Sequence, residues 1–214
     1  DAPVALLADR HAATGRTGQT VRAADAHAAI RDVAALAGPH NALNAAAAAV
    51  CLRGLGLTDD EIAHGMAGFS GLAHRLQPVT RHGPITFVND SKATNGVAAA
   101  CALAAYDSIY WIAGGEAKED GLGPAATATA NVERAYLIGS AAPDFAKTLQ
   151  GRVPIMHAGD LETATAAAFS DATAATPPDG SATILLSPAA ASFDQFDSFA
   201  ARGEAFCAIA HRLI

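Results

Sequence analysis

The sequence predicts an α/β fold built on a doubly wound, mostly parallel sheet. Between residues 77 and 213, short apolar runs alternate with longer alanine-rich stretches, a pattern typical of parallel strands joined by crossover helices. His82-Gly83-Pro84 separates the first two apolar runs and predicts a hairpin turn. The chain has 214 residues, 51% of them hydrophobic, which is enough for one large domain or somewhat more.

Six strands and five helices are expected in this alternating region. The strand candidates are Gln77–Arg81, Ile85–Asn89, Ile109–Ala113, Ala135–Ile138, Val153–His157 and Ile184–Ser187. The helix candidates are Thr94–Tyr106, a short one around Ala125–Ala130, Pro143–Gln150, Leu161–Ala175 and Asp194–Leu213.

The first third of the chain has a different character. Val4–Ala8 is a strand candidate, and the glycine-containing residues 11–38 favour small antiparallel strands and turns. Asn44–Leu55 is rich in alanine, the residue with the highest helix propensity, and it predicts a helix.

A second helix and a linker follow. Thr58 and Glu61 have the spacing of a capping box, so a helix is expected to begin there. Phe69–Arg75 is expected to be a linker. We therefore place a domain boundary that separates residues 1–72 from residues 73–214.

Composition argues against several classes of function. The formal net charge of −7 argues against nucleic-acid binding, and no apolar run is long enough to span a membrane. The first residues lack the basic region of a signal peptide. Cys51, Cys101 and Cys207 form no CxxC pair and have no histidine at ligand spacing, so no metal site is expected. These features predict a cytoplasmic protein.

Polar residues follow three of the predicted strands. Phe87–Asn95 brings two hydroxyls, a carboxylate and a lysine, and Tyr110–Lys118 brings paired glycines and a lysine. Thr183–Phe196 runs through small residues to Ser192, which has capping-box spacing with Gln195 and predicts a helix N-terminus.

In open α/β sheets, ligands bind outside the carboxyl ends of the strands. The three segments therefore predict a site for a small anionic ligand such as a dicarboxylic acid. The alternatives are an ordinary strand–loop–helix junction at Ser192, a plain turn at Gly114-Gly115 and a solvated surface lysine at Lys118.

The same segments resemble the Mur ligase family, in particular its D-glutamate-adding branch. The motifs that carry the resemblance are Asn89–Asn95, Gly114-Gly115 with Lys118, and Ser187–Phe196 with Phe199, Arg202 and Gly203. Upstream, Gly38–Ala46 resembles the family signature that closes the ATPase domain, and Phe69–Arg75 resembles the hinge into the last domain.

The resemblance implies an ATP-dependent amide ligase that adds D-glutamate to UDP-N-acetylmuramoyl-L-alanine in peptidoglycan synthesis, through an acyl phosphate. Residues 1–72 would be the tail of the central ATP-binding domain, and residues 73–214 the Rossmann-like glutamate-binding domain. Two alternatives stay open: a relative that adds L-glutamate or another amino acid, and a non-catalytic amino-acid-binding module.

Parts that the family needs are absent from this sequence. There is no GxxxxGK[ST] phosphate loop, and the family's N-terminal domain, carbamylated lysine and magnesium ligands have no counterpart here. The resemblance implies that ATP and Mg²⁺ act in the complete enzyme, with its missing N-terminal half. The isolated chain is expected to be inactive.

The resemblance also implies substrate contacts. Lys118 and Thr94 would contact the side-chain carboxylate of glutamate, and Ser192 with the Phe199 backbone would hold the other carboxyl end. A lysine, a hydroxyl and a helix N-terminus are each suitable partners for a carboxylate. Lys92 would meet developing negative charge, which makes Lys92 and Lys118 the catalytic candidates.

Four residues map onto positions that contact ATP in the family: Asn41, Asn44, Arg75 and Asp90. An arginine can bind phosphate bidentately, an amide can bind base or ribose, and a carboxylate can accept from ribose hydroxyls. The alternatives are that the two asparagines cap the alanine-rich helix, and that Asp90 and Ser91 cap the helix after the second strand.

Overall fold

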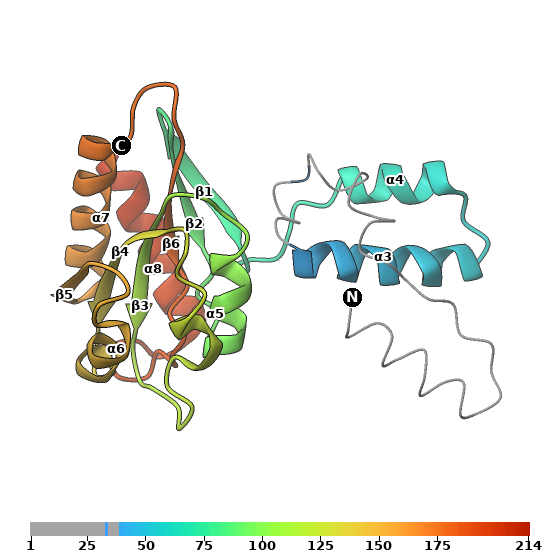
Figure 1. Ribbon diagram of the computed structural model, residues 1–214. Helices are drawn as coiled ribbons and strands as arrows, with labels where there is room; N and C mark the ends of the chain where they lie inside the picture. Colours follow the sequence, from blue (N-terminus) through green and yellow to red (C-terminus); the bar gives the residue numbers. More distant parts are fainter. Residues whose placement is uncertain (1–32, 34–38) are drawn as a thin grey trace. The chain divides into compact units, whose positions relative to one another are not determined.

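The computed structural model of the chain describes Val33 and residues 39–214 (Figure 1). The chain divides into two units, one ending at Ser70 and one comprising Gly71–Ile214. The strand and turns expected before residue 39 lie outside the described residues.

Among the described residues of the first unit, two helices, α3 at Pro39–Gly54 and α4 at Asp59–Ala67, pack against each other. Helix α3 begins at a proline, whose fixed φ suits a first helical position, five residues before the predicted start. Asn41 and Asn44 therefore lie inside the helix, and neither stands at its N-cap position.

The capping box of α4 is confirmed. The Thr58 hydroxyl accepts from the Glu61 N–H at 3.3 Å, and the Glu61 carboxylate accepts from the Thr58 N–H at 2.8 Å. These two bonds satisfy N–H groups at the helix start that have no partner within the helix.

The second unit is built on a six-stranded sheet with the order β1-β2-β6-β3-β4-β5. Its strands are β1 Gln77–His82, β2 Ile85–Asn89, β3 Ile109–Gly114, β4 Val132–Ile138, β5 Ile155–Gly159 and β6 Ala182–Leu186. Strands β1 and β2 form the predicted antiparallel hairpin, and the other neighbours pair in parallel. The predicted fold class and all six strands are confirmed, with ends that differ by a few residues.

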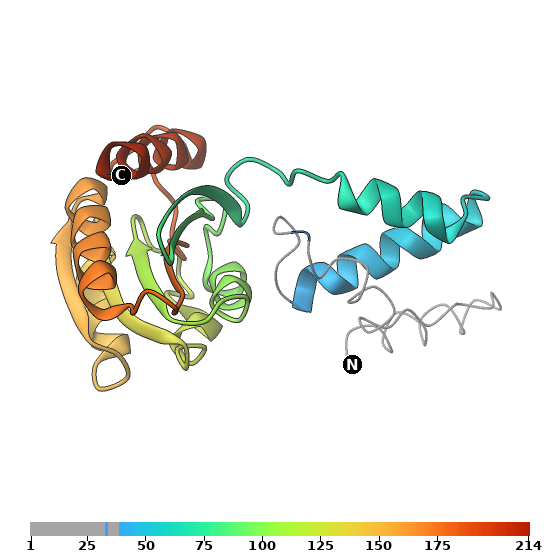
Figure 2. The same cartoon turned by 90° about the horizontal axis from the view of Figure 1, so that it is seen from above.

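Helices cover both faces of this sheet (Figure 1 and Figure 2). One face packs on α5 Gly96–Leu103, the 3-10 turn η2 Gly123–Ala126 and α6 Ala142–Leu149. The other face packs on α7 Leu161–Ala175 and α8 Phe199–Leu213. Helices on both faces are what a parallel sheet requires, because its strands are buried on both sides.

The two helix predictions nearest the site need correction. Helix α5 starts at Gly96 rather than Thr94, with Asn95 as its N-cap, whose side chain accepts from the Ala98 N–H at 2.9 Å. Asp90 and Ser91 are therefore not caps. Helix α8 starts at Phe199 rather than Asp194.

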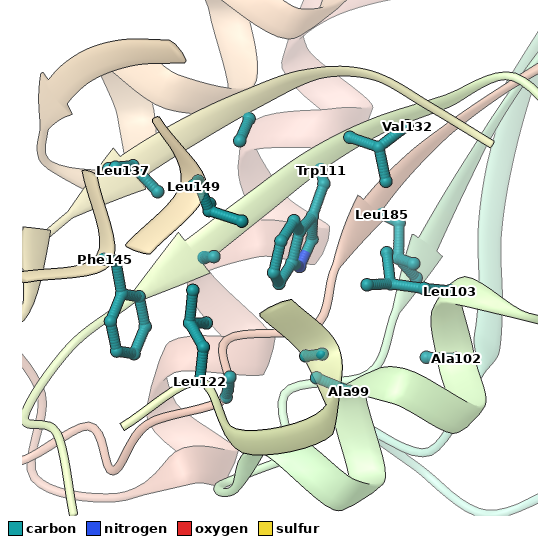
Figure 3. Close-up of a cluster of buried hydrophobic side chains, with 14 of the residues drawn as sticks. Ala99, Ala102, Leu103, Trp111, Leu122, Val132, Leu137, Phe145, Leu149 and Leu185 are labelled. Carbon is teal, nitrogen blue, oxygen red and sulfur yellow. The ribbon is translucent and has the colours of Figure 1, made fainter. Parts of the chain in front are cut away.

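Along each central strand, successive buried side chains point to opposite faces of the sheet. In β3, Trp111 points to the α5 side, whereas Tyr110 and Ile112 point to the α7 and α8 side. Figure 3 shows the Trp111 indole between Leu149 and Leu185, and its N–H donates to the Ser187 carbonyl at 2.8 Å. This hydrogen bond ties the core of the sheet to the loop that follows β6.

Candidate functional site

The loop between β6 and α8 joins the carboxyl ends of the parallel strands. On the β3 side, Ala191 and Glu116 exchange two backbone hydrogen bonds of 2.9 Å. On the β4 side, the Asp194 carboxylate accepts from the Ser140 N–H at 2.8 Å. At the end of β5, the Gln195 amide donates to the Gly159 carbonyl at 2.8 Å. This loop therefore fixes the edge of the sheet at which ligands of such folds bind.

The predicted capping box at Ser192 is wrong. Ser198 is the N-cap of α8, and its hydroxyl accepts from the Ala201 N–H at 3.0 Å. The Ser192 carbonyl instead accepts from the N–H groups of Gln195 and Phe196 in a turn. The physical reason is that the side chains of Asp194 and Gln195 bind neighbouring loops, so the residues after Ser192 are held in a turn rather than in a helix.

Ser192 still lies in the candidate site. The residue is 2% exposed, and within the described residues its hydroxyl forms no hydrogen bond. The nearby helix terminus is that of α8, where Phe199 is the first residue and its N–H has no partner within the helix. A buried hydroxyl and free helical N–H groups are both donors for an anion.

The paired glycines after β3 permit a close approach of two backbones. Gly114 and Gly115 have φ values of 125° and 126°, which other residues adopt only with strain. A Cβ on Gly115 would overlap the Ala191 carbonyl oxygen, and a Cβ on Gly114 would overlap the Ile138 carbonyl oxygen. The Gly-Gly pair is thus required by packing between strand ends.

Lys118 lies on a cavity of about 830 Å³ at the start of α5. The lining includes Asn95, Gly96 and Pro124, together with the carboxylate-bearing Asp120. Thr94 immediately precedes these residues and is half-buried. The structure therefore brings Lys118 to the N-terminal end of α5, where the ammonium and the helix dipole both favour an anion.

Asp90 braces the turn that leads into β1. One carboxylate oxygen accepts from the Leu76 N–H at 3.2 Å and the other from the Ser187 hydroxyl at 2.9 Å. Burial raises the pKa of Asp90 to about 6, although these hydrogen bonds and the charge of Arg75 act in the opposite direction. Leu76 and His74 have positive φ, so this bracing holds a strained turn in place.

Lys92 is placed beside an aromatic ring. Its ammonium lies 4.0 Å from the centre of the Phe199 ring, which is a cation–π contact. The Phe199 carbonyl accepts from the Ser91 hydroxyl at 2.8 Å, and the Lys92 N–H donates to the His74 carbonyl at 2.9 Å. The loop after β2 is thereby joined to the start of α8.

The residues expected to contact ATP are divided between the two units. Arg75 and Asp90 belong to the second unit, and the Arg75 side chain is exposed. Asn41 and Asn44 lie on α3, where the Asn44 amide donates to the Asn41 side-chain oxygen at 3.4 Å. Their roles toward ATP stay predictions.

Arg202 is a residue of the site for which the sequence analysis predicts no role. It lies on the first turn of α8, is 1% exposed and donates to three different loops at the carboxyl edge. In the sequence, Arg202 could have been singled out by its position four residues after the α8 N-cap, next to Gly203. A Cβ at Gly203 would overlap the His74 ring, so a larger residue is excluded there and α8 packs close to the turn before β1.

Two general properties bear on the site. Among the described residues, no group of three or more histidine, cysteine or acidic side chains could hold a metal ion. None of the helices at residues 39–214 is long and apolar enough to cross a membrane.

Curated relatives match most of this chain. A protein of Rhizobium meliloti (strain 1021) named UDP-N-acetylmuramoylalanine–D-glutamate ligase is 52% identical over 171 residues, which is 80% of this chain and 36% of the relative. A protein of the same name from Caulobacter sp. (strain K31) is 48% identical and covers 83% and 37%, respectively. One from Phenylobacterium zucineum (strain HLK1) is 45% identical and covers 94% and 41%. The chain thus spans well under half the length of these relatives.

Solved structures share the fold at low sequence identity. The UDP-N-acetylmuramate-alanine ligase of Thermotoga maritima has a TM-score of 0.54 at 14% identity, covering 82% of this chain and 38% of that one. A pseudomurein peptide ligase type C from Methanothermus fervidus has a TM-score of 0.52 at 15% identity, covering 83% and 36%.

A family model settles the affiliation that the site suggests. The model described as Mur ligase, glutamate ligase domain, matches residues 74–190, which is more than half of the chain. This range includes the loops after β2 and β3 and the strand β6. The loop that carries Ser192 follows β6. The chain belongs to the Mur ligase family and carries its glutamate ligase domain.

Proposed function

We propose that this chain is the amino-acid-binding part of an ATP-dependent ligase that adds D-glutamate to UDP-N-acetylmuramoyl-L-alanine. The observation that carries the proposal is the convergence of anion-binding groups at the carboxyl edge of the sheet. Lys118 meets the start of α5, and Ser192 lies in the loop that leads to α8. The relatives named as D-glutamate ligases, about half identical to this chain, support the choice of amino acid.

The two ends of the site suit the two carboxylates of glutamate. The ammonium of Lys118, with the Thr94 hydroxyl and the start of α5, would bind the side-chain carboxylate. Ser192 and the N–H of Phe199 would bind the other carboxylate. Holding both carboxylates directs the amine of the amino acid, and such orientation is a large part of the rate that an enzyme can supply.

Lys92 would serve the reaction as a nearby positive charge. Its contact with the Phe199 ring restricts the long side chain and keeps the ammonium at the start of α8. Negative charge develops on the oxygens of the carboxyl group under attack, and a fixed cation beside them stabilises that charge.

ATP would be held only in part by the residues described. The exposed guanidinium of Arg75 suits a phosphate, and the two amides on α3 suit ribose or base. Asp90 is less available, because both of its oxygens already accept hydrogen bonds. When bound, ATP activates the acceptor carboxylate by phosphorylation.

The test is a ligase assay on the complete protein that contains this chain. ADP release should require both UDP-N-acetylmuramoyl-L-alanine and D-glutamate. Turnover with L-glutamate in place of D-glutamate would indicate a relative of different stereospecificity. Glutamate binding without any turnover in the complete protein would favour a non-catalytic binding module.

A further inference from the structure

The buried side chain of Arg202 uses all of its hydrogen-bond donors within the protein. Its Nε donates to the Ser91 hydroxyl at 3.0 Å, and its Nη2 donates to the carbonyls of Ser91 at 3.0 Å and Ala190 at 3.1 Å. Its Nη1 donates to the Ala191 carbonyl at 3.1 Å and, at 3.4 Å, to that of Gly114. An arginine has five N–H donors, so each of them has an acceptor.

The charge of this arginine has no ion-pair partner among the described residues. All five acceptors are neutral. Burial lowers the pKa of Arg202 to about 10, although the charge of Asp194 acts in the opposite direction, so the guanidinium stays charged at neutral pH. A buried charge without a direct ion pair is unfavourable for folding, and an apolar side chain of similar size would often be at least as stable. Stability alone therefore does not account for an arginine here.

Arg202 fixes the orientation of the Ala191 carbonyl. It accepts from Arg202 and also from the Glu116 N–H at 2.9 Å, so the peptide between Ala191 and Ser192 is fixed from one side. No cis peptide occurs in the described part of the chain, and in a trans peptide the N–H points opposite to the carbonyl. The Ser192 N–H is therefore turned away from both Arg202 and Glu116.

The N–H and hydroxyl of Ser192 are fixed in direction but donate to no group of the protein that the structure describes. The residue is 2% exposed, yet neither its N–H nor its hydroxyl has a hydrogen-bond acceptor within the described residues. The Ser192 hydroxyl is not sealed from solvent, because the fully buried side-chain atoms without a partner in the described part of the chain are Tyr106 Oη and Arg134 Nε. An anion that reaches this surface can therefore accept from a hydroxyl and an N–H that no protein group uses.

We propose that Arg202 is a positioning residue which, by holding the Ala191 carbonyl, presents the N–H and hydroxyl of Ser192 to a carboxylate of the bound amino acid. The inference rests on the proposed function, because it names groups in the same glutamate site. Arg202 itself touches no substrate and acts through the Ala191–Ser192 peptide.

The first experiment compares Arg202→Lys with the wild type in the complete enzyme by steady-state kinetics. A lysine keeps the charge but cannot reach three loops at once. We expect KM for D-glutamate to rise at least about tenfold, while KM for ATP changes little. The melting temperature should fall, because buried carbonyls lose their donors. Arg212→Lys is the matched control, since Arg212 lies on the same helix in an exposed ion pair with Glu162 and should leave all constants unchanged.

Coupling to Ser192 separates positioning from general support of the fold. Arg202→Lys combined with Ser192→Ala should raise KM for D-glutamate no more than Arg202→Lys alone, because the hydroxyl is already misdirected. Multiplicative effects of the two changes, or equal losses toward glutamate and ATP, would overturn the inference.

A measurement on the wild type covers the case in which Arg202 variants fail to fold. The ¹⁵N–¹H signal of Ser192 should shift on addition of D-glutamate and its exchange with solvent should slow. No change at saturating D-glutamate would refute the inference while leaving the ligase function intact. A wild-type enzyme that does not use D-glutamate at all would overturn both.

Discussion

Lys118 is an exposed cation at the start of α5, and Lys118→Ala tests whether it binds substrate. In the complete enzyme we expect kcat/KM for D-glutamate to fall about 10- to 100-fold, because a hydrogen bond to a charged group contributes about 1.5–3 kcal/mol. KM for ATP should stay the same. Steady-state kinetics in which each substrate is varied separately would measure both values.

A second surface lysine provides the control. Lys147 on α6 forms an exposed ion pair with Asp144, and Lys147→Ala removes the same charge without approaching the cavity. If Lys118→Ala raised KM for ATP and left glutamate use unchanged, the assignment of Lys118 would be wrong.

Asp90 makes the stability of the second unit depend on pH. Its pKa is about 6 in the folded chain, above the ordinary value of 3.8, so the folded state binds more protons than the unfolded state between these values. The contribution of Asp90 to the free energy of unfolding therefore falls as pH rises from 4 to 7. Asp90→Asn removes this dependence.

The measurement is urea unfolding of wild type and Asp90→Asn at pH 4.5 and pH 7, followed by fluorescence of Trp111, the one tryptophan in the sequence. The difference in stability between the two proteins should move by about 2 kcal/mol in favour of the variant at the higher pH. A difference that is the same at both pH values would show that Asp90 is not buried as described.

At the scale of elements, Ser198 and Ser192 are two serines with opposite expected behaviour. Ser198→Ala removes the N-cap of α8 and should lower the free energy of unfolding by about 1 kcal/mol. Ser192→Ala removes a hydroxyl that supports no helix, so it should change stability little and raise KM for D-glutamate. Urea titration and glutamate kinetics on both variants would distinguish the two roles, and a larger stability loss from Ser192→Ala would contradict them.

The packing of α8 on the turn before β1 can be tested through its glycine. A Cβ at Gly203 would overlap the His74 ring and approach the Asn89 amide, so Gly203→Ala should lower the free energy of unfolding by about 1–3 kcal/mol. Gly65 on α4 has nothing within 4 Å of the added Cβ, and Gly65→Ala should be neutral or stabilising. Unfolding followed by circular dichroism would compare them.

Much of the fold was predictable because its signals are local. Strands β2, β3 and β6 are short apolar runs next to turn residues, and the Thr58 capping box involves residues three apart. The start of α8 was not predictable, because Ser192 and Ser198 both look like caps. What decides between them is the binding of Asp194 and Gln195 to loops that lie 54 and 36 residues away in sequence, respectively.

The site shows the same division. Lys118 at the start of α5 follows from its place after a strand, since strand ends meet at one edge. The role of Arg202 depends on contacts with Ser91 and Gly114, 111 and 88 residues away, and no sequence spacing reveals them. Asp90 has the right position but a different set of partners, because Leu76 and Ser187 already occupy its oxygens.

At the scale of the whole molecule, the chain should bind Mg-ATP weakly when it is isolated. It spans about 36–41% of the length of its relatives, it contains no phosphate-loop motif, and its candidate ATP contacts are a few polar side chains. Isothermal titration calorimetry of the 214-residue chain should give no micromolar binding of Mg-ATP. Micromolar affinity would mean that the chain carries a more complete nucleotide site than its sequence indicates.

The loop between β6 and α8 has a consequence for the entropy of ligand binding. Because it is tied to the ends of β3, β4 and β5 before any ligand arrives, few rotations remain to be frozen when a carboxylate binds. An amino acid with two charged ends is small and makes few contacts, so it cannot offset the ordering of a loose loop. The ties are therefore what allows so small a molecule to be held in a defined orientation.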